Sequence, residues 1–344
     1  MHISIVYSAN NNYIPYAYCS LMSLLAHRQT AAICHVYVLH TDVTAENQGF
    51  LRKLQTKALQ VTFVDCRPMK SRLEQLSLNL TYHFTIETYY RFFLAELLPQ
   101  LDKVLYLDAD TLICHDIADL WNIAVEDYYL AATRDLEIIR VSAEGKSADV
   151  SYFKDILQLQ DIHQYFQAGV MSVNLKKWRQ DNLQQKLLDR LACIKNPLYV
   201  DQDILNSVCQ GHIKFIPQNW DYTWHLPFMD QAYRSTLPEP YAEQYQAAQQ
   251  NPYIIHFTGE KMKPADMPWE PQAQLFWKCA ATSPFFEGLW QDFLARQKAA
   301  FQYAQQQKFT LLRYRILKNC LWGSKRKYYS KKYNLLWQKI YRYL

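Results

Sequence analysis

The most constraining feature of the chain is the stretch of residues 103–107, apolar after Lys103, which is followed by Asp108 and Asp110. Its length and its Val, Leu and Tyr side chains predict a buried strand. Ligands of open α/β sheets bind beyond the carboxyl ends of the strands, where two carboxylates are costly unless something positive compensates them. Because carboxylate oxygens suit Mg²⁺ or Mn²⁺, the pattern favours a cation that holds a diphosphate. The alternative is a strand followed by an ordinary Asp-rich turn.

Short apolar runs alternate with segments of helical pattern along much of the chain. Strands are expected at residues 3–7, 33–39, 61–64, 104–107, 129–133, 168–175 and 253–257. Helices are expected from the first turn to residue 25, at 44–58, at 87–97 and from residue 201 onward. This alternation predicts an α/β fold with a parallel-rich sheet. The chain has only 7 glycines and no glycine-rich loop after a strand, which excludes dinucleotide and P-loop phosphate cradles.

Cysteine usage and the amino-terminal residues point to a cytoplasmic protein. None of the 8 cysteines forms a Cys-x-x-Cys pair, which is typical of free thiols in a reducing compartment. The first residues read as a strand, not as a signal peptide. No apolar run reaches the roughly 18 residues of a membrane-spanning helix.

The positive charge of the chain is concentrated at its carboxyl end. Residues 293–344 contain 13 Lys and Arg and no Asp or Glu. These basic residues alternate with Trp, Tyr and Leu, which is typical of segments that lie on an anionic membrane. Nucleic acid is the rival target, but no nucleic-acid-binding module accompanies the segment, and its apolar content disfavours a disordered tail. We expect a globular part over residues 1–292 and a basic, aromatic, helical membrane-associating tail over residues 293–344.

An ordered set of short motifs occupies the first 280 residues. The motifs are Ala9-Asn10-Asn11-Asn12-Tyr13, Thr88-Tyr89-Tyr90-Arg91, Leu105-Tyr106-Leu107-Asp108-Ala109-Asp110, Ala168-Gly169-Val170 before Asn174-Leu175-Lys176-Lys177-Trp178, Asp201-Gln202-Asp203-Ile204-Leu205-Asn206, and His256 through Pro264. In this order and spacing the set resembles glycosyltransferase family 8, retaining enzymes that include lipooligosaccharide galactosyl- and glucosyltransferases. The resemblance implies a GT-A fold, a Rossmann-like nucleotide-sugar-binding domain, for residues 1–292.

The resemblance implies that Asp108, Asp110 and His256 bind Mn²⁺, or Mg²⁺, together with the diphosphate of a UDP-sugar. Two carboxylates and one imidazole suit Mn²⁺ better than Mg²⁺. Taken alone, His256 at a strand end is more typical of a hydrogen-bonded core histidine.

The residues that follow His256 favour the metal-binding interpretation. Gly259 permits close backbone approach to a phosphate, and Lys263 supplies a phosphate-binding charge. The chain departs from the family pattern by one extra residue before Lys263-Pro264. Lys261 is therefore a second candidate for the contact with the diphosphate.

The donor site implied by the resemblance includes the turn after the first strand. The family usually has an aspartate where Asn10 or Asn11 stands, and an asparagine carbonyl can also accept the uracil N3–H. The alternative is an Asn-rich turn that caps a helix. Arg91 is expected against the donor sugar or phosphate, with a surface arginine as the alternative. The cofactor-binding residues that the resemblance implies, besides the three metal ligands, are Ala9, Asn10, Asn11, Asn12, Tyr13, Arg91, Ala109, Gln167, Ala168, Gly169, Gly259, Lys261 and Lys263.

Three further residues are implied at the reacting sugar: Asp135, Asp201 and Gln202. Asp135 and Asp201 resemble aspartates that contact donor hydroxyls, although a carboxylate at Asp201 also suits a helix N-terminus. Gln167 stands where the family often has Asn, which changes the reach to the sugar. Gln202 is expected on the β-face of the anomeric carbon. Because an amide is a poor nucleophile, we expect front-face transfer with retention, in which UDP takes the acceptor proton.

The sequence therefore predicts a metal-dependent retaining hexosyltransferase. It would move galactose or glucose from UDP-galactose or UDP-glucose to a lipopolysaccharide or lipooligosaccharide acceptor at the inner face of the plasma membrane. The expected partners are the UDP-sugar, an oligosaccharide or glycolipid acceptor and an anionic membrane, but no nucleic acid. The alternatives are a capsule or protein glycosyltransferase and a catalytically silent protein that binds a sugar nucleotide or a membrane.

Overall fold

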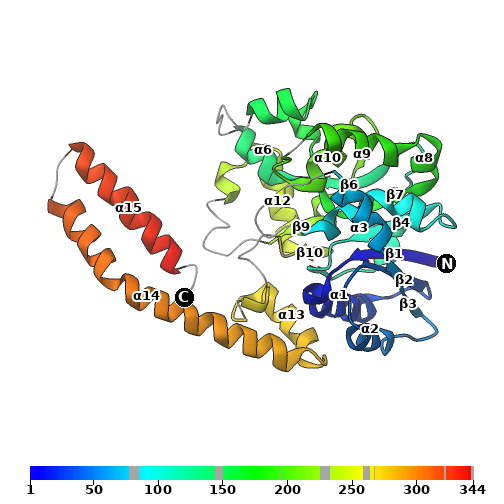
Figure 1. Cartoon of the computed structure of the whole chain (residues 1–344), viewed down its shortest axis with the longest axis horizontal. Helices are drawn as coiled ribbons and strands as arrows, with labels where there is room; N and C mark the ends of the chain where they lie inside the picture. Colours follow the sequence, from blue (N-terminus) through cyan, green and yellow to red (C-terminus); the bar gives the residue numbers. More distant parts are fainter. Residues whose placement is uncertain are drawn as a thin grey trace. The chain divides into compact units, whose positions relative to one another are not determined.

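The computed structural model describes residues 1–76, 85–143, 150–194, 196–224, 233–258, 264–266, 268–320 and 323–341. The chain divides into two compact units, Met1–Glu260 and Lys261–Leu344 (Figure 1). The predicted boundary between residues 292 and 293 lies inside helix α14 (Phe286–Cys320) of the second unit.

The first unit contains a seven-stranded sheet in the order β3-β2-β1-β4-β7-β6-β8. Its strands are β1 (His2–Ser8), β2 (Ile33–His40), β3 (Leu59–Asp65), β4 (Lys103–Leu107), β6 (Leu130–Arg134), β7 (Phe166–Asn174) and β8 (Ile213–Phe215). Strand β7 is antiparallel to β4 and β6, and the other pairs are parallel. The predicted parallel-rich α/β sheet is confirmed.

The order of the strands creates a switch point between β1 and β4. From β1 the chain adds β2 and β3 on one side, and it then returns to place β4 on the other side, with Val6 opposite Tyr106. Ligands of open α/β sheets bind at such a point. Because β7 is antiparallel, its first residues lie beside the carboxyl ends of β4 and β6. Asp108, Asp135 and residues 167–169 therefore share one edge of the sheet.

Helices cover both faces of this sheet, which explains why its central strands are apolar at successive positions. Tyr7 of β1 points to one face, where its hydroxyl lies 3.0 Å from that of Ser20 in α1 (Ile14–His27). Val6, Val104 and Tyr106 point to the other face, into a cluster built with α9 (Leu183–Cys193) and α10 (Val200–Cys209). Among the described residues of the unit, the other helices are η1 (Asn11–Tyr13), α2 (Ala45–Arg52), α3 (Arg67–Glu74), η2 (Ile86–Phe93), α4 (Leu94–Leu97), α5 (Ile117–Trp121), α6 (Leu136–Ala143), η3 (Tyr152–Ile156), η4 (Ile162–Gln164), α8 (Leu175–Gln180), η5 (Gln218–Asp221) and α12 (Tyr241–Gln250).

Two predicted helices differ from those observed. The helix expected at 44–58 ends at Arg52; further on, the hydroxyl of Thr56 accepts the backbone N–H groups of Ala58 and Leu59, so that it competes with helical bonding. The helix expected at 87–97 is present, but most of it is the 3₁₀ helix η2, which is followed by one turn of α4. A 3₁₀ stretch inside a helix often marks a functional segment.

A small second sheet, in the order β5-β10-β9, lies next to the switch point. It consists of β5 (Thr111–Ile113), β10 (Ile254–His256) and β9 (Tyr222–Thr223). His256 is opposite Thr111 of β5 and Thr223 of β9. In addition, the N–H of Phe257 donates to the carbonyl of Asp110 at 3.0 Å. This long-range pairing carries His256 to the aspartates that follow β4.

The second unit consists of η6 (Pro264–Asp266), α13 (Pro271–Ala281), α14 and α15 (Gly323–Tyr341). Trp277 of α13 packs edge-to-face on Trp290 of α14, with ring centroids 5.6 Å apart. Helix α15 runs back along α14 (Figure 1), with Lys318 3.8 Å above the ring of Tyr333. None of the described helices combines the length and the hydropathy needed to cross a membrane.

Candidate active site

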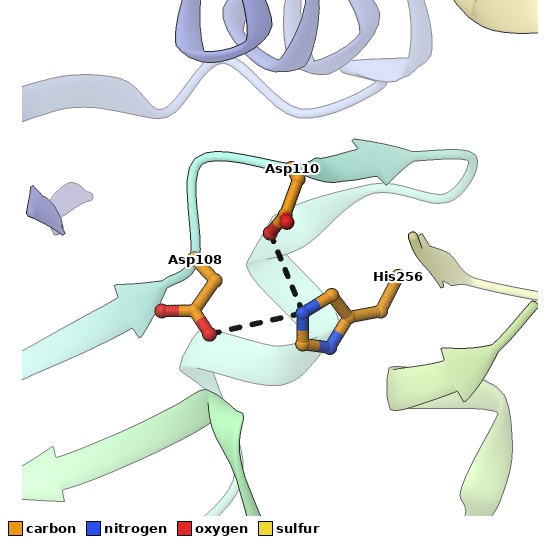
Figure 2. Close-up of side chains that lie close together, drawn as sticks. All are labelled: Asp108, Asp110 and His256. Carbon is orange, nitrogen blue, oxygen red and sulfur yellow. Dashed lines mark ion pairs between the residues drawn. The ribbon is translucent and has the colours of Figure 1, made fainter. Parts of the chain in front are cut away.

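Three side chains with metal-ligand chemistry meet beyond the carboxyl end of β4 (Figure 2). Asp108 follows β4, Asp110 precedes β5, and His256 ends β10. Nε2 of His256 lies 3.5 Å from Oδ1 of Asp110 and 3.7 Å from Oδ2 of Asp108. The three ligand atoms lie within 4.8 Å of one another. The structure thus brings together the three residues that the sequence predicts as metal ligands.

The carboxylate of Asp108 has one oxygen tied to the protein and one directed at His256. Its Oδ1 accepts hydrogen bonds from Nη2 of Arg91 at 2.8 Å and from the hydroxyl of Tyr106 at 3.2 Å. Its backbone N–H donates to the carbonyl of Gly169 at 2.7 Å. These bonds orient the carboxylate before any ion binds, as outer hydrogen bonds to metal ligands generally do.

His256 provides positive charge beside the two aspartates. Burial alone lowers the pKa of His256, but the carboxylates of Asp221 and Asp110 outweigh burial and raise this pKa well above its usual value. A divalent cation supplies the same compensation, with a neutral imidazole as its third ligand. Two carboxylate oxygens and an imidazole nitrogen at these separations fit such an ion.

Arg91 is buried beneath the cluster, so the interpretation as a surface arginine is excluded. Its guanidinium contacts Asp108, Asp201 at 3.0 Å and the carbonyl of Ala168 at 2.6 Å. It also lies 4.2 Å above the ring of Tyr106. These contacts place Arg91 directly behind Asp108, and its expected contact with the donor sugar or phosphate stays a prediction.

Gln202 and Asp135 form a hydrogen-bonded pair at the same edge of the sheet. Nε2 of Gln202 donates to Oδ2 of Asp135 at 2.8 Å, and its Oε1 accepts the N–H of Ala168 at 2.9 Å. The other oxygen of Asp135 accepts the N–H groups of Glu137 and Ile138 at the start of α6. Burial nevertheless raises the pKa of Asp135 to about 6.

Asp201 lies in the first turn of α10 and is buried. It forms the ion pair with Arg91 and accepts a hydrogen bond from the hydroxyl of Thr88. Burial raises the pKa of Asp201 to about 6, although Arg91 and Thr88 lower it. Asp201 therefore joins α10 to η2, a role beyond that of a carboxylate at a helix N-terminus.

The side-chain amide of Asn206 holds helix α10 against β7. Asn206 belongs to one of the sequence motifs, but no role was predicted for it. Asn206 accepts the N–H of Phe166 at 2.7 Å and donates to its carbonyl at 2.8 Å. Val200, just before Asp201, has a φ of 39°, which is strained for a β-branched residue. The anchored helix holds this strained residue in place next to the site.

Asp203 belongs to the same sequence motif as Asn206, and its carboxylate links parts of the fold. It is fully buried and accepts hydrogen bonds from the hydroxyls of Tyr152 at 2.6 Å and Tyr165 at 2.7 Å. It accepts a third from the N–H of Tyr199 at 2.8 Å. These bonds join α10 to η3 and to the start of β7.

In the asparagine turn after β1, the side-chain carbonyls of Asn10 and Asn11 accept hydrogen bonds from other protein groups. Oδ1 of Asn10 accepts the N–H of Asn12 at 3.1 Å, which makes Asn10 the cap of η1. Oδ1 of Asn11 accepts from the N–H of Thr44 at 3.2 Å and from Nδ2 of Asn47 at 2.7 Å. The helix-capping interpretation therefore applies to Asn10, and Asn11 ties the turn to α2.

The other predicted donor-site residues have varied surroundings. Ala9 and Ala109 are buried. The carboxylates of Asp110 and Asp108 raise the pKa of Tyr13 beyond the increase caused by burial, which places its phenol near the cluster. Gln167 accepts the N–H of Gly169. The predicted phosphate contacts at Gly259, Lys261 and Lys263 lie outside the described residues.

Two features of the site escaped sequence reasoning. Asp221 is fully buried and lies 2.9 Å from Nδ1 of His256, although no motif surrounds it. Gly169 was predicted as a donor contact, but a Cβ built at this position would lie 2.1 Å from Cε1 of His256. The glycine therefore leaves room for the imidazole ring.

The fold is that of the GT-A class of glycosyltransferases. The galactosyltransferase LgtC, solved with donor and acceptor sugar analogs, matches with a TM-score of 0.66 and 25% identity over 82% of this chain and 96% of that one. The bifunctional glycosyltransferase WbbM matches with a TM-score of 0.76 and 23% identity over 84% of this chain and 51% of that one.

The sequence comparisons then identify the family. The model of glycosyl transferase family 8 matches residues 4–269, so the chain belongs to this family of glycosyltransferases. The lipopolysaccharide 1,2-glucosyltransferase of Escherichia coli K12 is 25% identical over 96% of this chain and 92% of that protein. A protein of Haemophilus influenzae is 30% identical over 64% of this chain, and the match spans 63% of that relative's length.

The contact between Gly169 and His256 predicts the effect of one added methyl group. In the variant Gly169→Ala the imidazole must move, because the new Cβ overlaps Cε1. We expect Mn²⁺ binding, measured by calorimetry, to weaken at least about tenfold, and the protein to lose about 1–3 kcal/mol of stability. The control is Gly49→Ala, whose Cβ meets no atom within 4 Å. Equal Mn²⁺ affinity in both variants would contradict this account of Gly169.

The raised pKa values of Asp135 and Asp201 predict how the stability of the metal-free protein varies with pH. Both carboxyls have a folded-state pKa of about 6, against about 4 in an unfolded chain. The folded state therefore binds more protons between these values, and stability falls as pH rises from 4 through 6. We expect a higher urea midpoint at pH 5 than at pH 7.5. The difference should shrink in Asp201→Asn, and a midpoint that rises with pH would refute the assignment.

Proposed function

We propose that the chain transfers a hexose from a UDP-sugar to a lipopolysaccharide or lipooligosaccharide acceptor, with retention of the anomeric configuration. The observation that carries this proposal is the cluster of Asp108, Asp110 and His256 at the switch point of the sheet. Asp135, Asp201 and Gln202 lie at the same edge. The names of the Escherichia coli relative and of LgtC support glucose or galactose as the transferred sugar.

The cluster would hold Mn²⁺, or Mg²⁺, through Oδ2 of Asp108, Oδ1 of Asp110 and Nε2 of His256. When bound, the ion acts as a Lewis acid that neutralises the charge developing on the departing UDP. The chain contributes preorganisation, since Asp108 is held through its other oxygen and His256 through its other nitrogen. Such fixed groups need no rearrangement during the reaction.

The surroundings of Gln202 support front-face transfer. Both ends of its amide are held, one by Asp135 and the other by the N–H of Ala168. Asp203, the next residue, has both oxygens hydrogen-bonded and is fully buried. Neither residue is therefore arranged as a covalent nucleophile. Gln202 would line the face of the anomeric carbon opposite UDP, while UDP itself takes the proton of the acceptor hydroxyl.

We propose the remaining contacts with the donor from where these residues lie in the chain and in the fold. Asp135 and Asp201 would accept hydrogen bonds from donor hydroxyls, with their orientation set by Gln202 and Arg91. Residues 9–13 would line the nucleoside, and residues 167–169 the sugar. Lys261 or Lys263 would contact the diphosphate. A capsule or protein acceptor is the alternative to the lipopolysaccharide acceptor. A catalytically silent binding protein is the alternative that the hydrolysis assay below addresses.

We propose that the second unit attaches the enzyme to the inner face of the plasma membrane. Leu294, Phe301, Leu312 and Ile316 are exposed on α14, and their spacing places them on one face of the helix. On α15, Tyr328 and Leu335 are exposed one heptad apart. Exposed basic residues accompany both sets, and an apolar helix face with flanking Lys and Arg suits an anionic interface. This surface and the basic charge of residues 293–344 support a peripheral membrane location.

Removal of one metal ligand tests the transfer reaction. We expect Asp110→Asn, Asp108→Ala and His256→Ala each to lower Mn²⁺-dependent hydrolysis of UDP-glucose or UDP-galactose by roughly a hundredfold or more, because Lewis-acid stabilisation is worth several kcal/mol. Asp119→Asn is the matched control, since it removes an exposed carboxylate outside the cluster. Activity that resists EDTA, or normal rates in all three variants, would exclude the metal site. An inverted product linkage by NMR would exclude retention.

Charge reversal in the second unit tests membrane binding. Lys327 and Lys331 are exposed on α15, and each basic residue near an anionic surface contributes about 1 kcal/mol. We expect the double variant Lys327→Glu, Lys331→Glu to bind anionic vesicles at least roughly thirtyfold more weakly in sedimentation, with UDP-sugar hydrolysis unchanged. The control is Lys176→Glu, Lys186→Glu in the first unit, where both side chains are also exposed. An equal loss in both double variants would place the membrane surface elsewhere.

A further inference from the structure

Asp221 is a buried carboxylate whose position has no evident structural advantage. It is 0% exposed, and its Oδ1 lies 2.9 Å from Nδ1 of His256. Its Oδ2 has no hydrogen-bond partner among the described residues. An ionised carboxylate with one hydrogen bond in the protein interior is costly. A residue kept at such a cost is expected to act on its single partner.

The backbone around Asp221 directs its carboxylate at His256. Asp221 ends η5 and is followed by β9, which pairs with β10 so that Thr223 lies opposite His256. The backbone carbonyl of Asp221 accepts a hydrogen bond from Nε2 of Gln218 at 3.2 Å. The side chain therefore approaches His256 from a neighbouring strand, on the side of the ring away from Asp108 and Asp110.

The imidazole ring of His256 is held at three places. Nδ1 is held by Asp221, Nε2 faces the two aspartates of the cluster, and the Cε1 edge lies against Gly169. A ring rotated by half a turn would place a carbon atom toward Asp221. The hydrogen bond to Asp221 therefore selects one ring orientation and one position for the ring proton.

We propose that Asp221 is a positioning residue for the metal site. Its carboxylate accepts the Nδ1–H of His256, which leaves the lone pair on Nε2 directed at the space between Asp108 and Asp110. The negative charge of Asp221 also makes His256 a stronger ligand, as a carboxylate behind a metal-bound histidine does in general. This inference rests on the proposed metal site and adds to its two carboxylate ligands a third carboxylate, which acts through His256.

Two substitutions separate the hydrogen bond from the charge. Asp221→Asn keeps the size and an acceptor oxygen but removes the charge, whereas Asp221→Leu removes the acceptor as well. We expect Mn²⁺ affinity, measured from the EPR signal of free Mn²⁺, to fall in the order wild type, Asn, Leu. The loss in the Leu variant should reach about 10–100-fold, the range for partners behind metal ligands. The KM for the UDP-sugar at saturating Mn²⁺ should stay within about twofold.

A second readout reports the ring directly. In the Mg²⁺-bound wild-type protein the Nδ1–H of His256 should give the downfield NMR shift of a hydrogen bond to a carboxylate, and in Asp221→Leu this shift should be lost. Asp119→Asn is the matched control, because it breaks another His–carboxylate pair, with Nε2 of His115 at 2.8 Å. If the Leu variant does not fold, the Asn variant decides, since it preserves volume and one hydrogen bond.

The outcomes distinguish this inference from the metal site on which it rests. If Asp110→Asn weakens Mn²⁺ binding while both Asp221 variants bind as wild type does, Asp221 has no positioning role and the inference is overturned. If Asp110→Asn also binds Mn²⁺ normally, the metal site itself is wrong. Weakened binding in the Asp221 variants with unchanged thermal stability supports the inference, because a purely structural carboxylate would alter stability instead.

Discussion

The structure of the site depends on one buried guanidinium. Arg91 belongs to η2, and its guanidinium reaches the end of β4, β7 and α10. It forms ion pairs with Asp108 and Asp201 and donates a hydrogen bond to the carbonyl of Ala168. Removing one member of a buried ion pair typically costs about 3–5 kcal/mol, because a charge is left uncompensated. The end of β4 and the start of α10 are therefore held together by electrostatics as well as by packing.

This arrangement lets neighbouring carboxylates serve different purposes. One oxygen of Asp108 bonds Arg91 and the other faces His256 in the cluster. Asp201 forms an ion pair with Arg91 instead. His256 arrives from a separate sheet, through the pairing of β10 with β5 and β9. The site thus combines a rigid strand end with a distant segment, and non-local pairing fixes the distance between them. If the proposed ion binds there, these rigid elements would hold its ligands in place before the diphosphate arrives.

Those site residues could be predicted from the sequence that follow directly on a recognisable local pattern. The strand before Asp108 predicts the edge of the sheet where ligands bind. The switch point depends on the strand order, which the alternation of elements does not fix. The family resemblance and the glycine and lysine that follow it select His256, which taken alone is more typical of a core histidine. Asp221 could not be found in this way, because its role depends on the pairing of β9 with β10. Arg91 was selected, but its partners depend on how η2, β7 and α10 come together.

The central claim is that Asp108, Asp110 and His256 bind the ion that carries the diphosphate of the donor. Electron–nuclear double resonance on the protein with Mn²⁺ and UDP tests this claim most directly, because it detects the nuclei in contact with the bound ion. The account predicts a ¹⁴N coupling from one imidazole, absent in His256→Ala, together with ³¹P couplings from UDP. A spectrum with ³¹P couplings and no protein nitrogen, or with no coupling to either nucleus, would contradict it.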